Sequence, residues 1–187
     1  MDVANDPDTD PLADAAPEAF RPTADQLVEG NRAYARDFDD SELQVKPTRR
    51  MAVVTCMDSR IDVFAVLGLG NGEAHIIRNA GGVITDDVVR SLCLSQRYLG
   101  TREIVLVHHT DCGLQMVTED GLKSELEDEL GIKPWWAVES FDDPHVDVRQ
   151  SMRRLQLTPF VAHKDHVRGF VYDVTTGLLD EVEPDEG

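Results

Sequence analysis

The sequence has few basic residues: 18 Lys and Arg stand against 36 Asp and Glu in 187 residues, a formal net charge of -18. A surface this negative repels phosphate backbones and anionic lipid headgroups, so we expect neither nucleic acid nor membrane as a partner. The chain also lacks any apolar run of the roughly 18 to 20 residues that a membrane-spanning helix needs. These absences favour a globular protein and make two large classes of partner unfavourable.

Cysteine is also scarce, and the three residues present are Cys56, Cys93 and Cys112. An odd, low count argues against a disulfide framework and for reduced thiols that serve as core residues or metal ligands. The first 20 residues contain neither a basic stretch nor an apolar stretch of the kind found in secretory signals. We therefore expect a cytoplasmic protein. Cys93 lies between two leucines and is interpreted as a buried apolar residue.

Much of the excess of acidic over basic residues lies at the two ends of the chain, which suggests how the chain is organised. Residues 1–22 combine Asp, Pro and Ala without periodicity and are predicted to form a flexible acidic arm. Residues 180–187 are predicted to form an acidic tail, and 23–179 a single folded domain. Thr23 and Gln26 have the spacing of a capping box and predict that a helix starts there.

The centre of the chain alternates short apolar runs with amphipathic segments, which is typical of an α/β fold. We predict a mainly parallel four-stranded sheet flanked by helices, with an added antiparallel edge strand at the C-terminus. The expected strands are 51–55, 74–79, 103–108 and 167–174, followed by the edge strand at 178–182, and the expected helices include 85–100 and 142–157.

Two of the expected strands are followed directly by residue types that commonly bind metal ions, cysteine and histidine. Cys56 follows the first, and His109 and Cys112 follow the third. Ligands of open α/β sheets bind beyond the carboxyl ends of the strands, and neighbouring strands lie about 5 Å apart. Two thiolates and one imidazole suit Zn²⁺, and three protein ligands leave a fourth tetrahedral position for water or substrate. Because side chains alternate along a strand, only one of His108 and His109 can face the metal, and the H-x-x-C spacing favours His109.

The residues after Cys56 extend this chemistry. Asp58 is placed to accept a hydrogen bond from a water on the metal, and Arg60 can hold that carboxylate in a bidentate pair and keep it from binding the metal itself. Gly81 and Gly82 follow the second expected strand. They are predicted to adopt a backbone conformation that is unfavourable for other residues and to let the chain pass close to the site.

Three segments, CMDSR, IIRNAGG and HTDC, occur after successive strands in this order, and with them the chain resembles the β-class carbonic anhydrases over 23–179. The resemblance implies a catalytic domain in which Cys56, His109 and Cys112 bind zinc and Asp58 and Arg60 form a catalytic dyad. It further implies a homodimer or higher even oligomer with its active sites at the subunit interface. The implied activity is reversible hydration of CO₂ to bicarbonate and a proton, by attack of zinc-bound hydroxide.

Several alternatives stay open at this point. Relatives with the same zinc core hydrolyse COS or CS₂, and a non-catalytic, zinc-stabilised sensor would need the same ligands. Asp58 and Arg60 could form a simple surface ion pair. Trp135 and Trp136 are interpreted as a core or dimer contact rather than a binding platform. The H-x-x-H pair His163 and His166 is interpreted as unrelated to metal binding.

Overall fold

The computed structural model describes residues 22–184. All but the last residue of the expected N-terminal arm, 1–22, and the end of the expected acidic tail, 185–187, lie outside that range. The chain divides into two compact units at the junction between Glu42 and Leu43. Among the described residues, no helix is both long and apolar enough to cross a lipid bilayer.

The first unit contains the helix α1 (Ala24–Tyr34) and a short 3-10 turn, η1 (Asp40–Glu42). The predicted capping box is wrong. Thr23 is the N-cap residue, but its side chain makes no capping hydrogen bond, because its backbone (φ -115°, ψ 8°) lacks the extended conformation that aims the hydroxyl at the first turn. No residue of α1 is buried, and its apolar side chains Leu27 and Tyr34 are 71% and 56% exposed.

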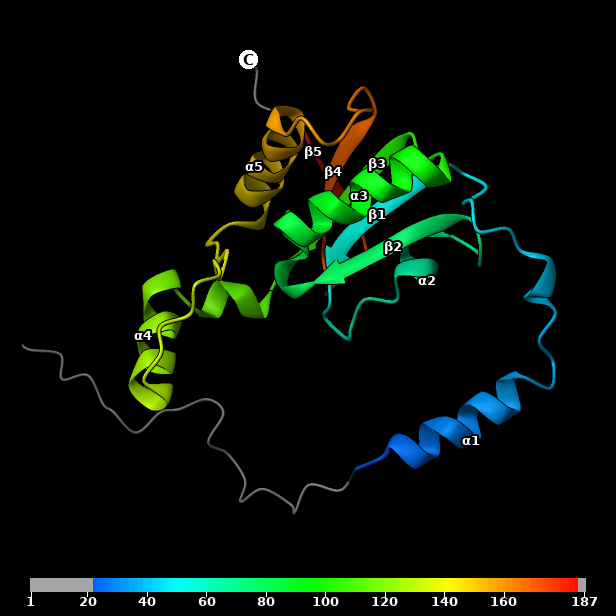
Figure 1. Cartoon of the computed structure of the whole chain (residues 1–187), viewed down its shortest axis with the longest axis horizontal. Helices are drawn as coiled ribbons and strands as arrows, with labels where there is room; N and C mark the ends of the chain where they lie inside the picture. Colours follow the sequence, from blue (N-terminus) through cyan, green and yellow to red (C-terminus); the bar gives the residue numbers. More distant parts are fainter. Residues whose placement is uncertain (1–21, 185–187) are drawn as a thin grey trace, which may run out of the picture. The chain divides into compact units, whose positions relative to one another are not determined.

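The second unit is built on one sheet of five strands in the order β2-β1-β3-β4-β5 (Figure 1). The first four strands pair in parallel and β5 joins antiparallel to β4. This is the predicted α/β fold with its antiparallel edge strand. The strands are β1 (Met51–Cys56), β2 (Ala74–Asn79), β3 (Glu103–His109), β4 (Val167–Tyr172) and β5 (Leu179–Val182).

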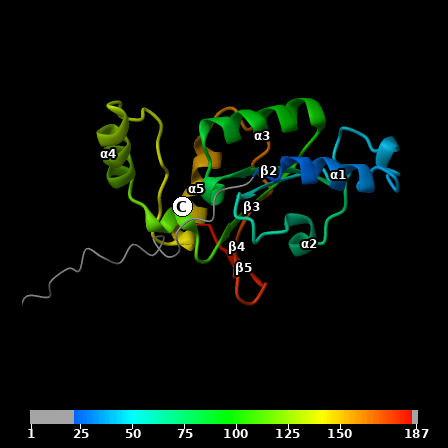
Figure 2. The same ribbon diagram turned by 90° about the horizontal axis from the view of Figure 1, so that it is seen from below.

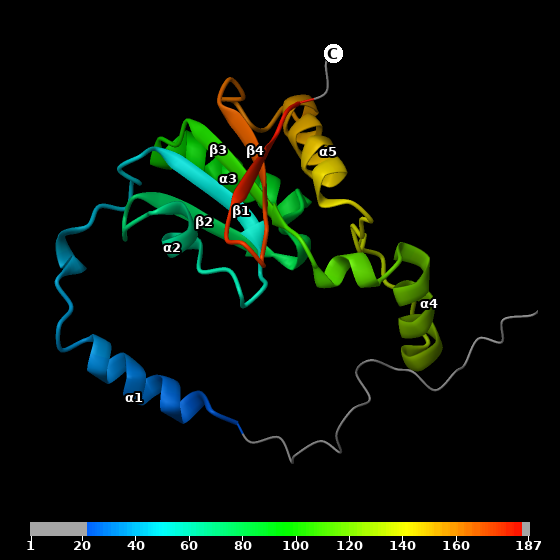
Figure 3. The ribbon, with the colours of Figure 1, turned by 180° about the vertical axis from the view of Figure 1, so that it is seen from behind.

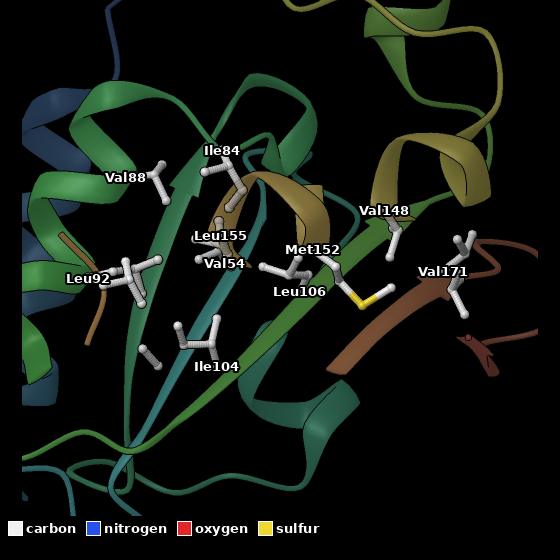
Figure 4. Close-up of a cluster of buried hydrophobic side chains, with 13 residues drawn as sticks. Val54, Ile84, Val88, Leu92, Ile104, Leu106, Val148, Met152, Leu155 and Val171 are labelled. Atoms are coloured by element: carbon white, nitrogen blue, oxygen red, sulfur yellow. The ribbon is translucent and has the colours of Figure 1, made fainter. Parts of the chain in front are cut away.

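Helices cover both faces of this sheet. Helices α3 (Asp86–Leu99) and α5 (Pro144–Leu157) pack on one face, where Leu92 and Leu155 meet strand residues such as Leu106 in the main apolar cluster (Figure 4). The opposite face carries the short helix α2 (Val63–Leu67), seen in front of the sheet in Figure 3. Because both faces are covered, the central strands β1 and β3 are nearly continuous buried runs, as the strands of parallel sheets usually are.

The predicted boundaries of α3 are confirmed. The hydroxyl of Thr85 accepts a hydrogen bond from the Val88 amide, and Gly100 ends the helix in the left-handed conformation (φ 77°). Asp143 caps α5 in the same way, accepting from the amides of His145 and Val146, while Pro144 occupies the first turn.

Two helices were not expected. Helix α2 has only five residues, too few for a helical period to show in the sequence. Helix α4 (Glu119–Leu130) buries none of its residues and stands away from the sheet (Figures 1 and 2). Trp135, in the loop that follows it, is 93% exposed, so the reading of that residue as core is wrong. Cys93 is partly exposed rather than buried and lines an apolar hollow of about 680 Å³ with Val89, Leu94 and Phe160.

Candidate metal centre

The sheet topology brings the three predicted ligands together. Cys56 is the last residue of β1 and His109 the last residue of β3, and these strands are parallel neighbours. Cys112 follows after a turn in which Asp111 adopts a positive φ of 55°. One donor atom from each of Cys56, His109 and Cys112 lies within 4.8 Å of the other two. It is the one such group of His, Cys, Asp or Glu side chains that the described residues contain.

The imidazole of His109 is oriented for metal binding. Its Nδ1 lies 2.9 Å from the carbonyl oxygen of Thr110, an acceptor only, so Nδ1 carries the proton and donates. The other ring nitrogen, Nε2, is fully buried and has no hydrogen-bond partner within the described chain. A buried acceptor without a partner is costly, whereas a metal ion would use that lone pair.

The donors fit zinc in kind and in spacing. Two sulfurs bound tetrahedrally at about 2.3 Å from Zn²⁺ lie about 3.8 Å apart. The Sγ atoms of Cys56 and Cys112 are 3.9 Å apart, and all three ligand residues are buried. Soft sulfur and imidazole donors in this arrangement favour Zn²⁺ over the oxygen-seeking ions Mg²⁺ and Ca²⁺.

The two thiols share a proton unequally. The hydrogen bond from the Cys112 thiol lowers the pKa of Cys56 well below the usual thiol range, against the effect of burial. The same hydrogen bond, together with burial, raises the pKa of Cys112. One thiolate is therefore available before a metal arrives, and binding of the ion would displace the proton from the second thiol.

His108 points away from this cluster, in agreement with the choice of His109 as the ligand. Its Nε2 lies 2.7 Å from the Asp147 carboxylate on α5, and its ring stacks on Phe141. His163 contacts Arg102 instead of a metal ligand, and His166 lies beside Asp165. Among the described residues, neither histidine belongs to the group of side chains that could hold a metal ion, and the interpretation of the H-x-x-H pair stays a prediction.

Asp58 and Arg60 form the bidentate pair that their spacing predicts. Arg60 donates from Nε (3.0 Å) to Oδ1 of Asp58 and from Nη2 (2.8 Å) to its Oδ2. The backbone amide of Arg60 also donates to Oδ1, at 2.9 Å. These bonds to Arg60 lower the pKa of Asp58 to about 2, so its carboxylate is ionised at neutral pH. Oδ2 of Asp58 lies 3.8 Å from Nε2 of His109, beside the ligand cluster.

Sequence reasoning missed two residues that support the site. Asp111 accepts a hydrogen bond from Nη1 of Arg60 at 2.7 Å. No local pattern marks this contact, because it depends on the backbone conformation of the turn that carries Asp111. Arg78, inside the IIRNAGG segment, donates to the carbonyl oxygens of Cys56 (2.9 Å) and Asp58 (2.7 Å). A basic residue at the end of the strand beside β1 was the available signal for Arg78. Through these two bonds Arg78 holds the loop that carries the ligand Cys56 and the carboxylate of Asp58.

Gly81 and Gly82 have the predicted backbone conformation, with φ of 78° and 74°. They lie in a 3-10 turn, η2 (Ala80–Gly82), that follows β2. A Cβ atom on Gly82 would lie 2.9 Å from the backbone nitrogen of Cys56, so glycine lets this turn approach the ligand loop. Their place in a substrate pocket stays a prediction.

Comparison with known proteins agrees with this geometry. A family model described as carbonic anhydrase matches residues 51–140. Beta-carbonic anhydrase 1 of Mycobacterium tuberculosis is 52% identical over 160 residues, which are 86% of this chain and 98% of that protein. A carbon disulfide hydrolase of Acidithiobacillus thiooxidans is 31% identical over 74% of this chain and 79% of its own length.

Solved structures give the same picture. The carbonic anhydrase from Streptococcus mutans superposes with a TM-score of 0.82 at 41% identity, covering 88% of this chain and 99% of that one. A carbonic anhydrase from Glaciozyma antarctica superposes with a TM-score of 0.79 at 35% identity, covering 87% and 100%. The matched residues 51–140 include the strands β1, β2 and β3 and the loops that carry the ligand cluster.

Proposed function

Because this chain belongs to the β-class carbonic anhydrase family and is an enzyme that hydrates CO₂ to bicarbonate, we propose that it does so at a zinc ion bound by Cys56, His109 and Cys112. The observation that carries this proposal is the buried Nε2 of His109, which lacks a partner and lies in one cluster with two thiols. A zinc ion held there would lower the pKa of a water molecule toward neutrality and so would supply the hydroxide nucleophile that CO₂ hydration requires.

Asp58 and Arg60 are placed to assist the loss of a proton from the water that attacks CO₂. Asp58 is ionised and its Oδ2 lies beside His109 Nε2, so it can accept a hydrogen bond from a water held at that end of the cluster. Arg60 occupies both oxygens of Asp58. The guanidinium therefore restrains the carboxylate from approaching the ligand cluster and becoming a fourth ligand itself.

The experiment that tests the function is a stopped-flow measurement of CO₂ hydration on purified protein with its zinc content quantified. We expect turnover together with about one zinc per chain. Zinc removal with a chelator should abolish the activity, and added zinc should restore it. A protein that holds stoichiometric zinc and shows no turnover would instead be the non-catalytic, zinc-stabilised alternative.

A second candidate substrate has a specific observation behind it, since the carbon disulfide hydrolase of A. thiooxidans is 31% identical over most of this chain. CS₂ and COS are linear molecules with an electrophilic carbon, as CO₂ is, so the same nucleophile can attack them. Assaying CO₂, COS and CS₂ side by side on one preparation separates the candidates. Release of hydrogen sulfide far faster than CO₂ hydration would favour the second.

The assembly and location are further parts of the proposal. Helix α1 buries no residue within the described chain yet carries exposed apolar side chains, which supports the predicted homodimer. Cys56 and Cys112 lie close enough that oxidation would join the two ligand sulfurs, so a reducing compartment such as the cytoplasm suits the site. Light scattering of the zinc-loaded protein tests the assembly, and a monomer at micromolar concentration would contradict it.

Replacing Arg60 tests the dyad. In Arg60→Ala, Asp58 loses the guanidinium that holds both its oxygens, and we expect CO₂ hydration at neutral pH to fall about tenfold or more at unchanged zinc content. The measurement is the stopped-flow assay with zinc determined in parallel. Arg168→Ala is the matched control, because it removes an equally well-paired arginine whose carboxylate partner, Glu181, lies on β5. Undiminished turnover in Arg60→Ala would show that the dyad is only a surface ion pair.

A further inference from the structure

Arg60 is hydrogen-bonded to two aspartates, one in each of the loops that carry metal ligands. Its Nε and Nη2 atoms donate hydrogen bonds to the carboxylate of Asp58, as described above. Nη1 donates to Oδ2 of Asp111 and Nη2 also donates to the backbone carbonyl of Asp111, both at 2.7 Å. Asp58 and Asp111 share Nη2, which has two hydrogens, so both aspartates can be bound at the same time.

Arg60 needs such a second contact. Its side chain is 46% exposed, so the bidentate pair with Asp58 alone would leave one side of the guanidinium in water and free to change rotamer. Asp58 itself is only 15% exposed. A bond on the far side, from a loop that is fixed by β3, holds the plane of the guanidinium in the orientation that Asp58 uses.

The backbone of Asp111 is arranged for this contact. Its φ of 55° is unusual for a residue with a side chain, and Asp and Asn tolerate it better than most. In this conformation both the carboxylate and the carbonyl oxygen of Asp111 reach Arg60. The residue thus connects the His109–Cys112 turn to the Cys56–Arg60 loop without belonging to the ligand cluster.

We infer that Asp111 is a positioning residue, which fixes Arg60 so that Arg60 keeps Asp58 from approaching the bound metal. This inference rests on the proposed function, since it concerns the same zinc site. It differs from the direct role of Arg60 because the side chain of Asp111 is bonded to Arg60 and is not a member of the ligand cluster. Its loss should act only through the freedom that it gives to Arg60 and Asp58.

The test uses Asp111→Gly, because glycine adopts a positive φ without strain and the change removes only the carboxylate. The cobalt(II)-substituted protein is titrated with thiocyanate, and binding is followed by the visible absorption of the metal. If Asp58 gains access to the fourth coordination position, it competes with the anion. We expect the thiocyanate dissociation constant to rise about tenfold, which corresponds to the loss of one charge-assisted contact.

Two single variants make the result specific. Asp111→Asn keeps a neutral acceptor for Arg60 and should show a smaller rise, and it serves in place of the glycine variant if that protein does not retain cobalt. Glu139→Gly is the matched control, since Glu139 is also an acidic residue at positive φ (58°) whose carboxylate pairs with an arginine, Arg154, at 2.7 Å. It should bind thiocyanate as the parent protein does.

The double variant Asp111→Gly with Asp58→Ala decides between positioning and general damage to the turn. With no carboxylate left to enter the site, thiocyanate affinity should return to within about twofold of that of Asp58→Ala alone. Unchanged anion affinity in Asp111→Gly, or a loss that persists in the double variant, would overturn the inference. A parent protein that binds metal but does not hydrate CO₂ would refute the proposed function and leave this titration valid, because it needs no turnover.

Discussion

The Cys56→Ser protein should contain less than about a tenth of the parent's zinc and should lose CO₂ hydration by more than about a hundredfold. Serine is nearly the same size, but its hydroxyl is not ionised at neutral pH and is a poor zinc ligand, whereas the Cys56 thiol is the one whose pKa is lowered. Zinc content by atomic absorption and the stopped-flow rate are the two measurements.

Cys93→Ser is the control for this substitution, since it makes the same chemical change on α3, in a residue outside the ligand cluster. It should keep about one zinc per chain and nearly the parent activity. If Cys56→Ser kept both zinc and activity, or if the two serine variants behaved alike, the assignment of Cys56 as a ligand would be wrong.

The largest expected loss of stability comes from adding one methyl group at Gly82. In Gly82→Ala the new Cβ would lie 2.9 Å from the backbone nitrogen of Cys56 and 2.9 Å from the carbonyl carbon of Thr55. Both contacts are with backbone of β1, which cannot move aside as a flexible side chain can. The positive φ of 74° adds its own penalty for a non-glycine residue. We expect a loss of about 3 kcal/mol in the free energy of unfolding.

Gly100→Ala separates the two causes. Gly100 has nearly the same φ, 77°, but a Cβ there would have no neighbour within 4 Å. It should lose only about 1 to 2 kcal/mol, the backbone penalty alone. Urea unfolding of both variants without zinc gives the comparison, and a zinc titration shows whether the displaced β1 end also weakens the site. Equal losses in the two variants would contradict a role for the close approach to Cys56.

The sheet and the ligand cluster could be predicted because each depends on short-range patterns. The apolar runs of β1 and β3 end directly at Cys56 and His109, and the parallel topology that follows from alternating strands and helices places those ends together. Thr85 and Gly100 similarly mark the ends of α3 by local chemistry alone. In each case, the information lies within a few residues of the feature.

Features that depend on particular backbone angles, or that have no hydrophobic period, could not be predicted. Asp111 is aimed at Arg60 by a backbone angle that the sequence does not reveal. Helix α4 lacks a buried apolar face, so it has little of the periodicity by which helices are recognised. The capping box at Thr23 failed because a four-residue pattern does not specify the φ and ψ of its first residue.

The pairing of β1 with β3 has an energetic consequence for the metal. Cys56 and Cys112 are separated by 56 residues, and closing a loop of that length in a disordered chain would cost about 4 kcal/mol of entropy. In the folded chain, the pairing of β1 with β3 already holds these residues together, so the donor atoms are in place before an ion binds. The same ion should bind the unfolded chain about a thousandfold more weakly, which makes zinc a selective stabiliser of the native state.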